Sequence, residues 1–382
     1  MANYDYEIVN GRKIRVRPKE TVSEIDKNGY FRRQPNHFTT PFGDGENDLK
    51  AEGNKRYRLV WAKLCHWSNR AAIVRELEGL EDQISVNMVE HAPHEKNLGW
   101  EYVYNENNID PVLGDQFLSE AYYRADDDYQ GRTTVPALID TTTGKVVNND
   151  YNWLTTYFEV NFLPWHKKGA PELYPVELRE EIDKMNLWLF DNINNAVYRS
   201  SFSRSNEGHF DGVNTFYAAM DRLEKRLETN RFLFGDYVTD SDIRLYVTLA
   251  RLDIRYTAQL GETKRPLYTY KNLWGYAKEL WEIPAFAHHT DFAAIIRQGR
   301  IEGEEDGFRA STHYDLALPK IDWDAQWKVS TERAYLSSDP THPIYLGNNR
   351  RFDIDPTWYD LGAESPKKEE KETPPSCGCY CG

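Results

Sequence analysis

The chain has 382 residues, of which 40% are hydrophobic and 14% aromatic, and its formal net charge at pH 7 is −14. This apolar content excludes a wholly disordered chain, and the length suits two domains with additional segments. The acidic balance argues against nucleic acid as a partner, because phosphate contacts need a positively charged face. No stretch approaches the ~20 continuous apolar residues of a membrane helix, and the polar N-terminus lacks the apolar segment of a secretory signal.

The distribution of cysteine indicates a reducing compartment. Of the four cysteines, Cys377, Cys379 and Cys381 lie close to the C-terminus, which leaves Cys65 alone in the body of the chain. A single cysteine cannot form an internal disulfide framework, so we expect a cytoplasmic protein without membrane partners. The tail cysteines either are incidental or bind a soft metal or exchange electrons with Cys65. No metal site is predicted in the folded body.

The first half of the chain predicts alternating strands and helices. Residues 1–54, rich in Gly, Asn and charge, predict an N-terminal extension that wraps a domain. Residues 56–64 are aromatic and β-branched enough for a strand. Apolar residues then recur at helical spacing from Trp67 to Leu77, and Gly79 stands where that helix should end. Residues 84–90 predict a second strand.

A hairpin and a further helix complete this unit after a polar insertion from His91 to about Thr133. Residues 136–140 and 146–149 predict the hairpin, and a helix is expected from about 151 to 162. This order predicts an α/β thioredoxin-like domain over residues 55–165, in which the second crossover is poorly marked by the sequence.

From about residue 171 the pattern is helical, which predicts an all-α domain over residues 166–325. Thr239 and Asp242 have the spacing of a capping box, so we interpret Asp242 as a structural helix cap rather than a catalytic carboxylate. Residues 326–382 predict a C-terminal extension that packs without regular structure and ends in a disordered, Cys-containing tail.

Cys65 lies between the first predicted strand and its helix. Free N–H groups and the macrodipole at a helix N-terminus favour a thiolate, the form of cysteine that attacks sulfur. His66 and Arg70 add possible positive charge nearby. The spacing is Cys-x-x-Ser, with Ser68 in place of a resolving cysteine, so a mixed disulfide at Cys65 requires an outside thiol. The alternative is that Cys65 is a small buried apolar residue.

Two other segments favour the reactive thiol. Thr134, Val135 and Pro136 immediately precede a strand, where a cis-proline would present backbone groups to a bound thiol. Asp150 follows the next strand at the start of a helix. There a carboxylate and helix N–H groups can hold the ammonium and carboxylate of a γ-glutamyl group.

Together these residues resemble the Xi-class glutathione transferases, the glutathionyl-hydroquinone reductases, over roughly residues 38–297. The resemblance is carried by LCHWSNR, GWEY, GRTTVPALID, VVNND, NNAVY, FLFGDYVTDSDIRLYVTLARLD, YKNLWGYAKELWEIP and TDF. It implies a thioredoxin-like N-terminal domain followed by an all-α glutathione-transferase C-terminal domain. It also implies a homodimer, glutathione as co-substrate, and a small aromatic or quinone-derived electrophile as the second substrate.

In that family the active-site cysteine attacks the glutathionyl sulfur of a glutathionyl-hydroquinone, and a second glutathione releases oxidised glutathione. By resemblance, Cys65 is the nucleophile. The same resemblance assigns glutathione binding to Trp100, Arg132, Val135 and Asp150, and the lining of the electrophile pocket to Tyr198 and Tyr256. From the residues alone, the favoured interpretation of Trp100, Tyr198 and Tyr256 is that they are aromatic residues that pack in the interior.

The chain departs from the family at several positions. His66 and Ser68 replace the proline and alanine of Cys-Pro-Trp-Ala, Tyr151 stands in place of a serine, and Gly299-Arg300 occurs where the family has tyrosines. These changes leave the cysteine in place, but they alter the expected binding sites for glutathione and for the aromatic electrophile. Two alternatives therefore remain: a non-catalytic glutathione-transferase-like binding module, or a thiol transferase with another substrate or low-molecular-weight thiol.

Overall fold

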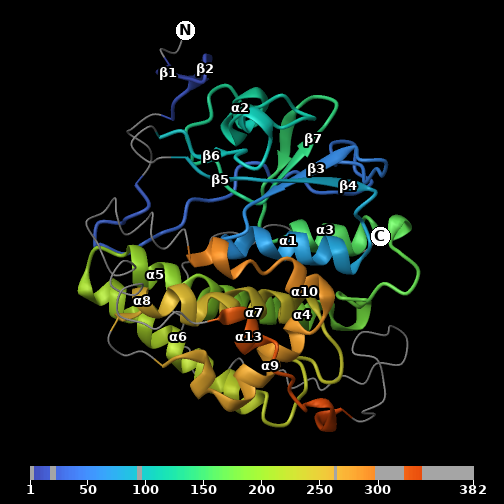
Figure 1. The fold of residues 1–382 in the computed structure, drawn as a ribbon, viewed down its shortest axis with the longest axis vertical. Helices are drawn as coiled ribbons and strands as arrows, with labels where there is room; N and C mark the ends of the chain where they lie inside the picture. Colours follow the sequence, from blue (N-terminus) through green and yellow to red (C-terminus); the bar gives the residue numbers. More distant parts are fainter. Residues whose placement is uncertain (1–3, 18–22, 93–96, 262–264, 297–321, 338–382) are drawn as a thin grey trace.

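A mixed four-stranded sheet organises the first half of the chain (Figure 1). The computed structural model describes residues 4–17, 23–92, 97–261, 265–296 and 322–337. The central strand β3 runs parallel to β4 and antiparallel to β7, and β7 pairs with β8 in an antiparallel hairpin. The strands, in sheet order, are β4 (Ile84–Met88), β3 (Tyr57–Trp61), β7 (Ala137–Asp140) and β8 (Lys145–Asn148).

The predicted strand–helix–strand unit is present at the start of this sheet. All five residues of β3 are buried, as expected for a strand that is covered on both faces. Helix α1 (His66–Leu77) connects β3 to β4 and ends just before Gly79, whose φ of +73° is a conformation that favours glycine. The strand is shorter than expected, because the chain leaves the sheet after Trp61.

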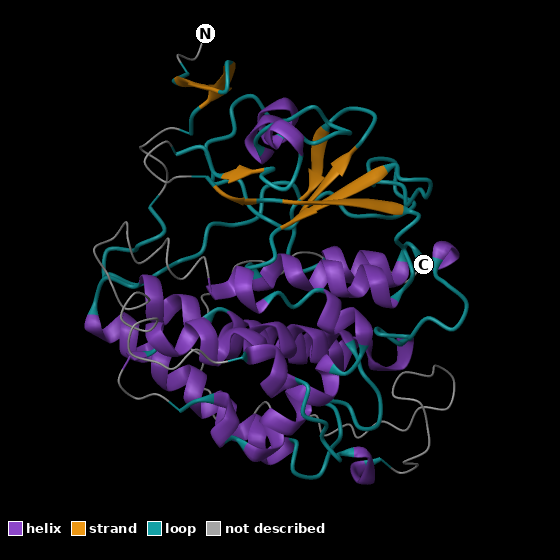
Figure 2. Ribbon diagram, in the orientation of Figure 1, coloured by secondary structure: helices purple, strands orange, loops and turns teal. Residues whose placement is uncertain are grey.

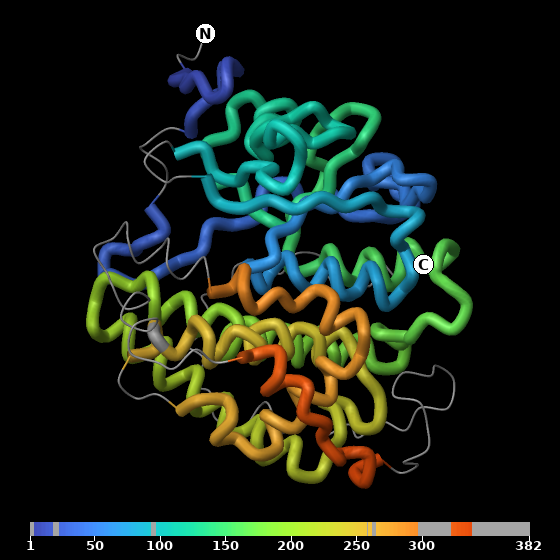
Figure 3. The backbone as a smooth tube through the Cα atoms, viewed as in Figure 1, coloured from blue at the N-terminus to red at the C-terminus, as the bar shows by residue number. Residues whose placement is uncertain are grey.

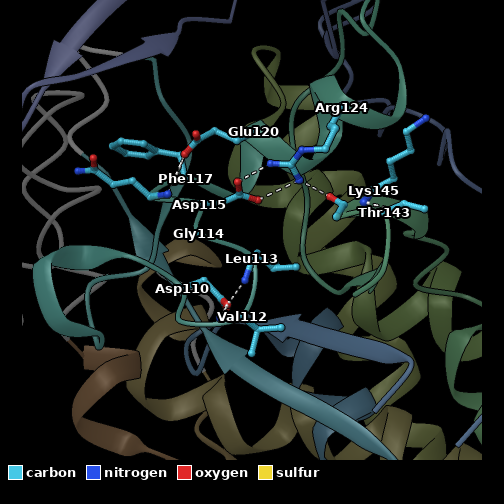
Figure 4. Close-up of polar contacts among 12 residues, drawn as sticks. Asp110, Val112, Leu113, Gly114, Asp115, Phe117, Glu120, Arg124, Thr143 and Lys145 are labelled. Carbon is cyan, nitrogen blue, oxygen red and sulfur yellow. Dashed lines mark hydrogen bonds and ion pairs between the residues drawn. The ribbon is translucent and has the colours of Figure 1, made fainter. Parts of the chain in front are cut away.

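The second crossover contains a helix, α2 (Leu118–Ala125), inside the stretch interpreted as a polar insertion. Polar contacts shape the loop before it (Figure 4). One oxygen of Asp110 accepts from the backbone N–H groups of Val112 and Leu113, at 2.8 and 2.9 Å. The side chain of Asp115 pairs with Arg124 in α2. The same stretch holds the small hairpin of β5 (Glu90–His91) and β6 (Trp100–Glu101).

Helices cover both faces of the sheet and then continue into a helical half (Figure 2). Helices α1 and α3 (Leu154–Val160) lie between the sheet and the helical half, and α2 lies on the opposite face. The prediction of a thioredoxin-like unit followed by a helical unit is confirmed. The helical half comprises α4 (Arg179–Leu189), α5 (Ala196–Phe202), α6 (Asn206–Arg226), α7 (Asp240–Arg251), α8 (Thr257–Gln259), α9 (Lys271–Trp281), α10 (Pro284–His288) and α13 (Trp323–Trp327).

Helix α7 forms the centre of this half, and every one of its residues is buried. It begins with the predicted capping box of Thr239 and Asp242. Asp242 accepts from the backbone N–H of Thr239 at 2.8 Å, so its interpretation as a structural cap is confirmed. Helices α4 and α7 each continue into a π-helical turn, at Phe190–Asn194 and Leu252–Tyr256 respectively.

The last described residues include the short helix α13, whose Trp327 is buried against Tyr246 and Phe292, and a 3₁₀ turn at Ala334–Leu336 within the extension that was expected to be irregular. Gly299, Arg300 and the three tail cysteines lie outside the described residues. Within the described ranges, no helix is long and apolar enough to cross a membrane.

The N-terminal residues form a hairpin of β1 (Tyr6–Val9) and β2 (Arg12–Arg15), followed by a segment that contacts both halves. We call this segment, residues 23–38, the N-terminal strap; its trace runs down one side of the molecule in Figure 3. The backbone N–H of Phe31 donates to Ser203 Oγ in the helical half, at 3.1 Å. The backbone N–H of Phe38 donates to Asn149 Oδ1 beside the sheet, at 2.9 Å.

Candidate functional site

Cys65 is the N-cap residue of α1, at the end of the loop that leaves β3. Its carbonyl accepts from Asn69 N at 3.0 Å and so begins the helix. Its Sγ lies 3.8 Å from the carbonyl oxygen of Val135, to which the thiol donates. The side chain is 9% exposed. The strand–loop–helix geometry therefore places a free thiol where α1 begins, against the loop that precedes β7.

Hydrogen bonds from two sides fix the loop that carries Cys65. Ser68 Oγ accepts from Ala62 N at 3.1 Å and lies 3.3 Å from the carbonyl of Cys65, so Ser68 supports the backbone. From α7, the buried Arg251 donates to the carbonyls of Lys63 and Leu64, both at 2.8 Å. Sequence reasoning missed Arg251. The available signal was a cation at the end of a helix that is otherwise rich in apolar residues.

The loop before β7 is held by Trp100, whose Nε1 donates to the carbonyl of Thr133 at 3.1 Å. The indole is buried and stacks on His91, with ring centroids 3.7 Å apart. The peptide bond between Val135 and Pro136 is cis, as the sequence predicted. Trp100 thus supports the backbone segment that faces the Cys65 thiol.

The burial of His66 argues against the expectation that it adds positive charge beside Cys65. Burial, reinforced by the nearby charges of Arg251 and Arg33, holds the pKa of His66 well below its ordinary value. Arg70 does carry charge at neutral pH, although burial and the charge of Arg244 lower the pKa of Arg70 to about 9. The guanidinium of Arg70 donates to the carbonyl of Tyr151.

Aromatic rings enclose His66 on several sides. The centroids of Trp67, Tyr198 and Tyr256 lie 4.3, 5.2 and 5.8 Å from its ring. The hydroxyl of Tyr256, in the π-helical turn after α7, lies 3.2 Å from His66 Nδ1. Burial raises the pKa of Tyr256 well above its usual value, so its hydroxyl is protonated. Both predicted pocket tyrosines therefore gather at the residue that follows Cys65.

The side chain of Arg132 is bound by the N-terminal strap. Its Nε and Nη2 donate to the two carboxylate oxygens of Glu24, at 2.9 and 2.8 Å. Burial opposes the charge of Glu24, but the hydrogen bonds and charge of Arg132 outweigh it and lower the pKa of that carboxyl. Gln34 of the strap accepts from the backbone N–H of Arg132 at 2.9 Å.

The strap also binds Asp150, at the start of the turn before α3. Asp150 Oδ1 accepts from Asn36 Nδ2 at 2.8 Å and from Asn152 N at 2.9 Å. Burial raises the pKa of Asp150 despite these hydrogen bonds. The ring of Tyr151 packs on Trp67, with centroids 4.7 Å apart, where the family resemblance has a compact serine.

Arg33 of the strap is a further residue that sequence reasoning missed. Its guanidinium carbon lies 4.6 Å from the ring centroid of Trp67 and 4.4 Å from that of Tyr198. Its Nε donates to Asn195 Oδ1 at 3.0 Å. The cation therefore joins the aromatic rings around His66 to the strap. Nothing in the local sequence distinguishes it from the neighbouring Arg32, which pairs with Asp26 at the surface.

Comparisons with known proteins find glutathione transferases. The family model of the glutathione S-transferase C-terminal domain matches residues 197–279. Glutathione S-transferase omega-like 2 of Schizosaccharomyces pombe is 35% identical over 280 residues, which cover 70% of this chain and 88% of the relative. Glutathionyl-hydroquinone reductase YqjG of Escherichia coli is 33% identical over 240 residues, covering 63% of this chain and 73% of the relative.

Among solved structures, the Xi glutathione S-transferase of Phanerochaete chrysosporium matches with a TM-score of 0.65 and 33% identity. The match covers 71% of this chain and 88% of that one. Sequence identity above 30% over most of the length of each relative, together with the shared two-part fold, establishes the family. The chain belongs to the Xi-class glutathione transferases, the family that includes the glutathionyl-hydroquinone reductases.

Proposed function

We propose that the chain is a glutathione-dependent thiol transferase of the glutathionyl-hydroquinone reductase type, with Cys65 as its nucleophile. The observation that carries the proposal is the place of the thiol. Cys65 caps the N-terminus of α1, and its sulfur faces the Val135 carbonyl beside the rings around His66. A helix N-terminus stabilises the thiolate, which is the nucleophile in exchange at sulfur.

The reaction has two steps. The Cys65 thiolate attacks the glutathionyl sulfur, the sulfur–sulfur bond forms, and the bond from that sulfur to the aromatic carbon breaks. The two electrons of that bond stay with the aromatic part, which also takes one proton from water over the reaction, so the hydroquinone leaves in reduced form. A second glutathione thiolate then attacks the mixed disulfide, which releases oxidised glutathione and restores the Cys65 thiolate.

The other predicted site residues divide between two roles in this proposal. Trp100, Arg132, Val135 and Asp150 hold the glutathione part, and Tyr198 with Tyr256 lines the space for the aromatic part. Support comes from the contact of Val135 with Cys65 and from the packing of both tyrosines on His66.

The test is a single-turnover reaction of the full chain with a glutathionyl-hydroquinone in the absence of free glutathione. Intact-protein mass spectrometry should show one glutathione added to the protein, and peptide mapping should locate it on Cys65. Adding glutathione should then release oxidised glutathione. A protein that liberates no hydroquinone and gains no adduct would refute the proposal.

A second candidate function, a non-catalytic binding module, is favoured by one observation. Arg132 and Asp150 are already bound by Glu24 and Asn36 of the N-terminal strap. If Arg132 stays paired with Glu24 and Asp150 stays bonded to Asn36, neither side chain is available to bind glutathione, and its affinity gains little from them. A variant that breaks one of these strap contacts therefore distinguishes the enzyme from the non-catalytic binding module.

Replacing Glu24 by alanine should tighten glutathione binding up to ~10-fold, because a freed Arg132 can pair with a glutathione carboxylate. Isothermal titration calorimetry measures the change directly. The matched control is Asp127→Ala, which breaks a different ion pair between the N-terminal extension and the thioredoxin-like unit, Arg15–Asp127 at 3.0 Å. Equal affinities in the wild type and both variants would show that Arg132 does not bind glutathione.

A further inference from the structure

The imidazole of His66 has one nitrogen that finds no partner. The side chain is 1% exposed, and Nε2 makes no hydrogen bond within the part of the chain that the structure describes. A buried polar nitrogen without a partner is costly, which makes Nε2 a candidate for contact with a bound ligand. The opposite nitrogen, Nδ1, lies 3.1 Å from Thr248 Oγ1 and 3.2 Å from the Tyr256 hydroxyl.

Two buried hydroxyls, of Thr248 and Tyr256, bear on which nitrogen of His66 carries the proton. Asn194 Nδ2 donates to Thr248 Oγ1 and to the carbonyl of Arg244, both at 2.8 Å. A carbonyl can only accept, which fixes that amide nitrogen as a donor. Thr248 Oγ1 accepts from Asn194 and still has its own hydrogen to donate, as does the Tyr256 hydroxyl, and both oxygens face His66 Nδ1. We take Nδ1 as the acceptor of these hydroxyls, which places the proton of the neutral ring on Nε2.

The surroundings of this N–H group suit an oxygen that carries negative charge. Tyr198 and Tyr256 pack against the ring, and Cys65 immediately precedes it in the chain. The charges of Arg33, Arg70, Arg251 and Arg255 all act on His66. The site thus combines an unpartnered imidazole nitrogen, nearby positive charge and packed aromatic rings beside the residue that carries the thiol.

We propose that His66 Nε2–H donates a hydrogen bond to the aromatic oxygen that becomes negative as the substrate's carbon–sulfur bond breaks. In the keto form of the substrate, the ring carbon that bears sulfur has already taken a proton from water. Attack by Cys65 then sends the carbon–sulfur electron pair to the carbonyl oxygen, which becomes a phenolate. His66 stays neutral throughout, and water supplies the proton of the product hydroxyl. This role rests on the proposed function and makes His66 a catalytic residue.

Two variants of His66 test the role. His66→Phe keeps a ring of similar size and removes the donor, and His66→Gln retains an N–H group at a similar reach. Because His66→Phe lacks the N–H donor, its kcat for glutathionyl-hydroquinone reduction should fall ~10²–10³-fold. The kcat of His66→Gln should be much closer to that of the wild type. With chlorinated hydroquinones of increasing acidity, the deficit of His66→Phe should shrink, because a stabler phenolate depends less on the donor.

A reaction without an aromatic oxygen provides the structural control. The rates at which iodoacetamide alkylates Cys65 and oxidised glutathione forms its mixed disulfide should match the wild type in both variants. Parallel losses in these rates and in hydroquinone reduction would overturn the inference, because they indicate a disturbed thiol. Full activity of His66→Phe would also overturn it. A wild-type chain that never releases hydroquinone would instead refute the proposed function.

Discussion

Replacing Cys65 by serine should lower glutathionyl-hydroquinone reduction by at least ~10³-fold, because removing a nucleophile abolishes the covalent route. A hydroxyl at the N-cap of α1 keeps the geometry but stays protonated at neutral pH, and an oxygen cannot form the mixed disulfide. The measurement is the release of hydroquinone and of oxidised glutathione under steady-state conditions. The thermal midpoint should remain close to that of the wild type, since serine is similar in size and the hydrogen bond of the thiol to the Val135 carbonyl is long, at 3.8 Å.

The control for this prediction is a chain in which Cys377, Cys379 and Cys381 are all serine. It should retain wild-type turnover if the outside thiol alone resolves the mixed disulfide at Cys65. A large loss in this triple variant would instead assign the resolving step to the tail. Turnover by Cys65→Ser near the wild-type level would exclude Cys65 as the nucleophile and assign the reaction to another group of the chain.

The fold was predictable where it depends on local periodicity. The strand before Cys65, the helix from Trp67 to Leu77 and the glycine that ends it were all marked by residue type and spacing. Helix α2 was not, because a loop rich in polar residues precedes it and only four of its eight residues are buried. Its position is fixed by contacts such as Asp115 with Arg124, which carry no periodic signal.

The candidate site was predictable only in part, because contacts between segments that are distant in sequence leave no local signal. The helix N-terminus at Cys65 and the cis-proline loop follow from neighbouring residues. The neutrality of His66 does not, because it depends on burial under Tyr256 and on the charge of Arg251, more than 180 residues away in the chain. The ion pair between Glu24 and Arg132 likewise joins two segments that are distant in sequence.

The capping residue of α7 supplies the largest expected effect on stability. Replacing Asp242 by alanine should lower the free energy of unfolding by ~3–5 kcal/mol, because a buried acceptor of several hydrogen bonds is lost. Its carboxylate accepts from Leu233 N at 2.9 Å, Thr239 N at 2.8 Å and the Tyr276 hydroxyl at 2.8 Å. Urea denaturation followed by tryptophan fluorescence measures the change.

The matched control is Ser205→Ala at the N-cap of α6, where a single bond to Gly208 N at 3.2 Å is lost. That variant should lose only ~1 kcal/mol, the usual cost of removing a helix cap. A loss in Asp242→Ala no larger than in Ser205→Ala would show that the buried network around α7 adds nothing to an ordinary cap.

The effect of Asp242 should also depend on pH. Burial raises the pKa of Asp242 from 3.8 to about 6, although its hydrogen bonds oppose the shift. A carboxyl with a raised pKa in the folded state contributes most stability at low pH and loses it as pH rises through about 6. The stability gap between the wild type and Asp242→Ala should therefore be about 1 kcal/mol larger at pH 5 than at pH 8. An equal gap at both pH values would mean that the buried carboxyl is already ionised at pH 5, so that its hydrogen-bond donors outweigh burial.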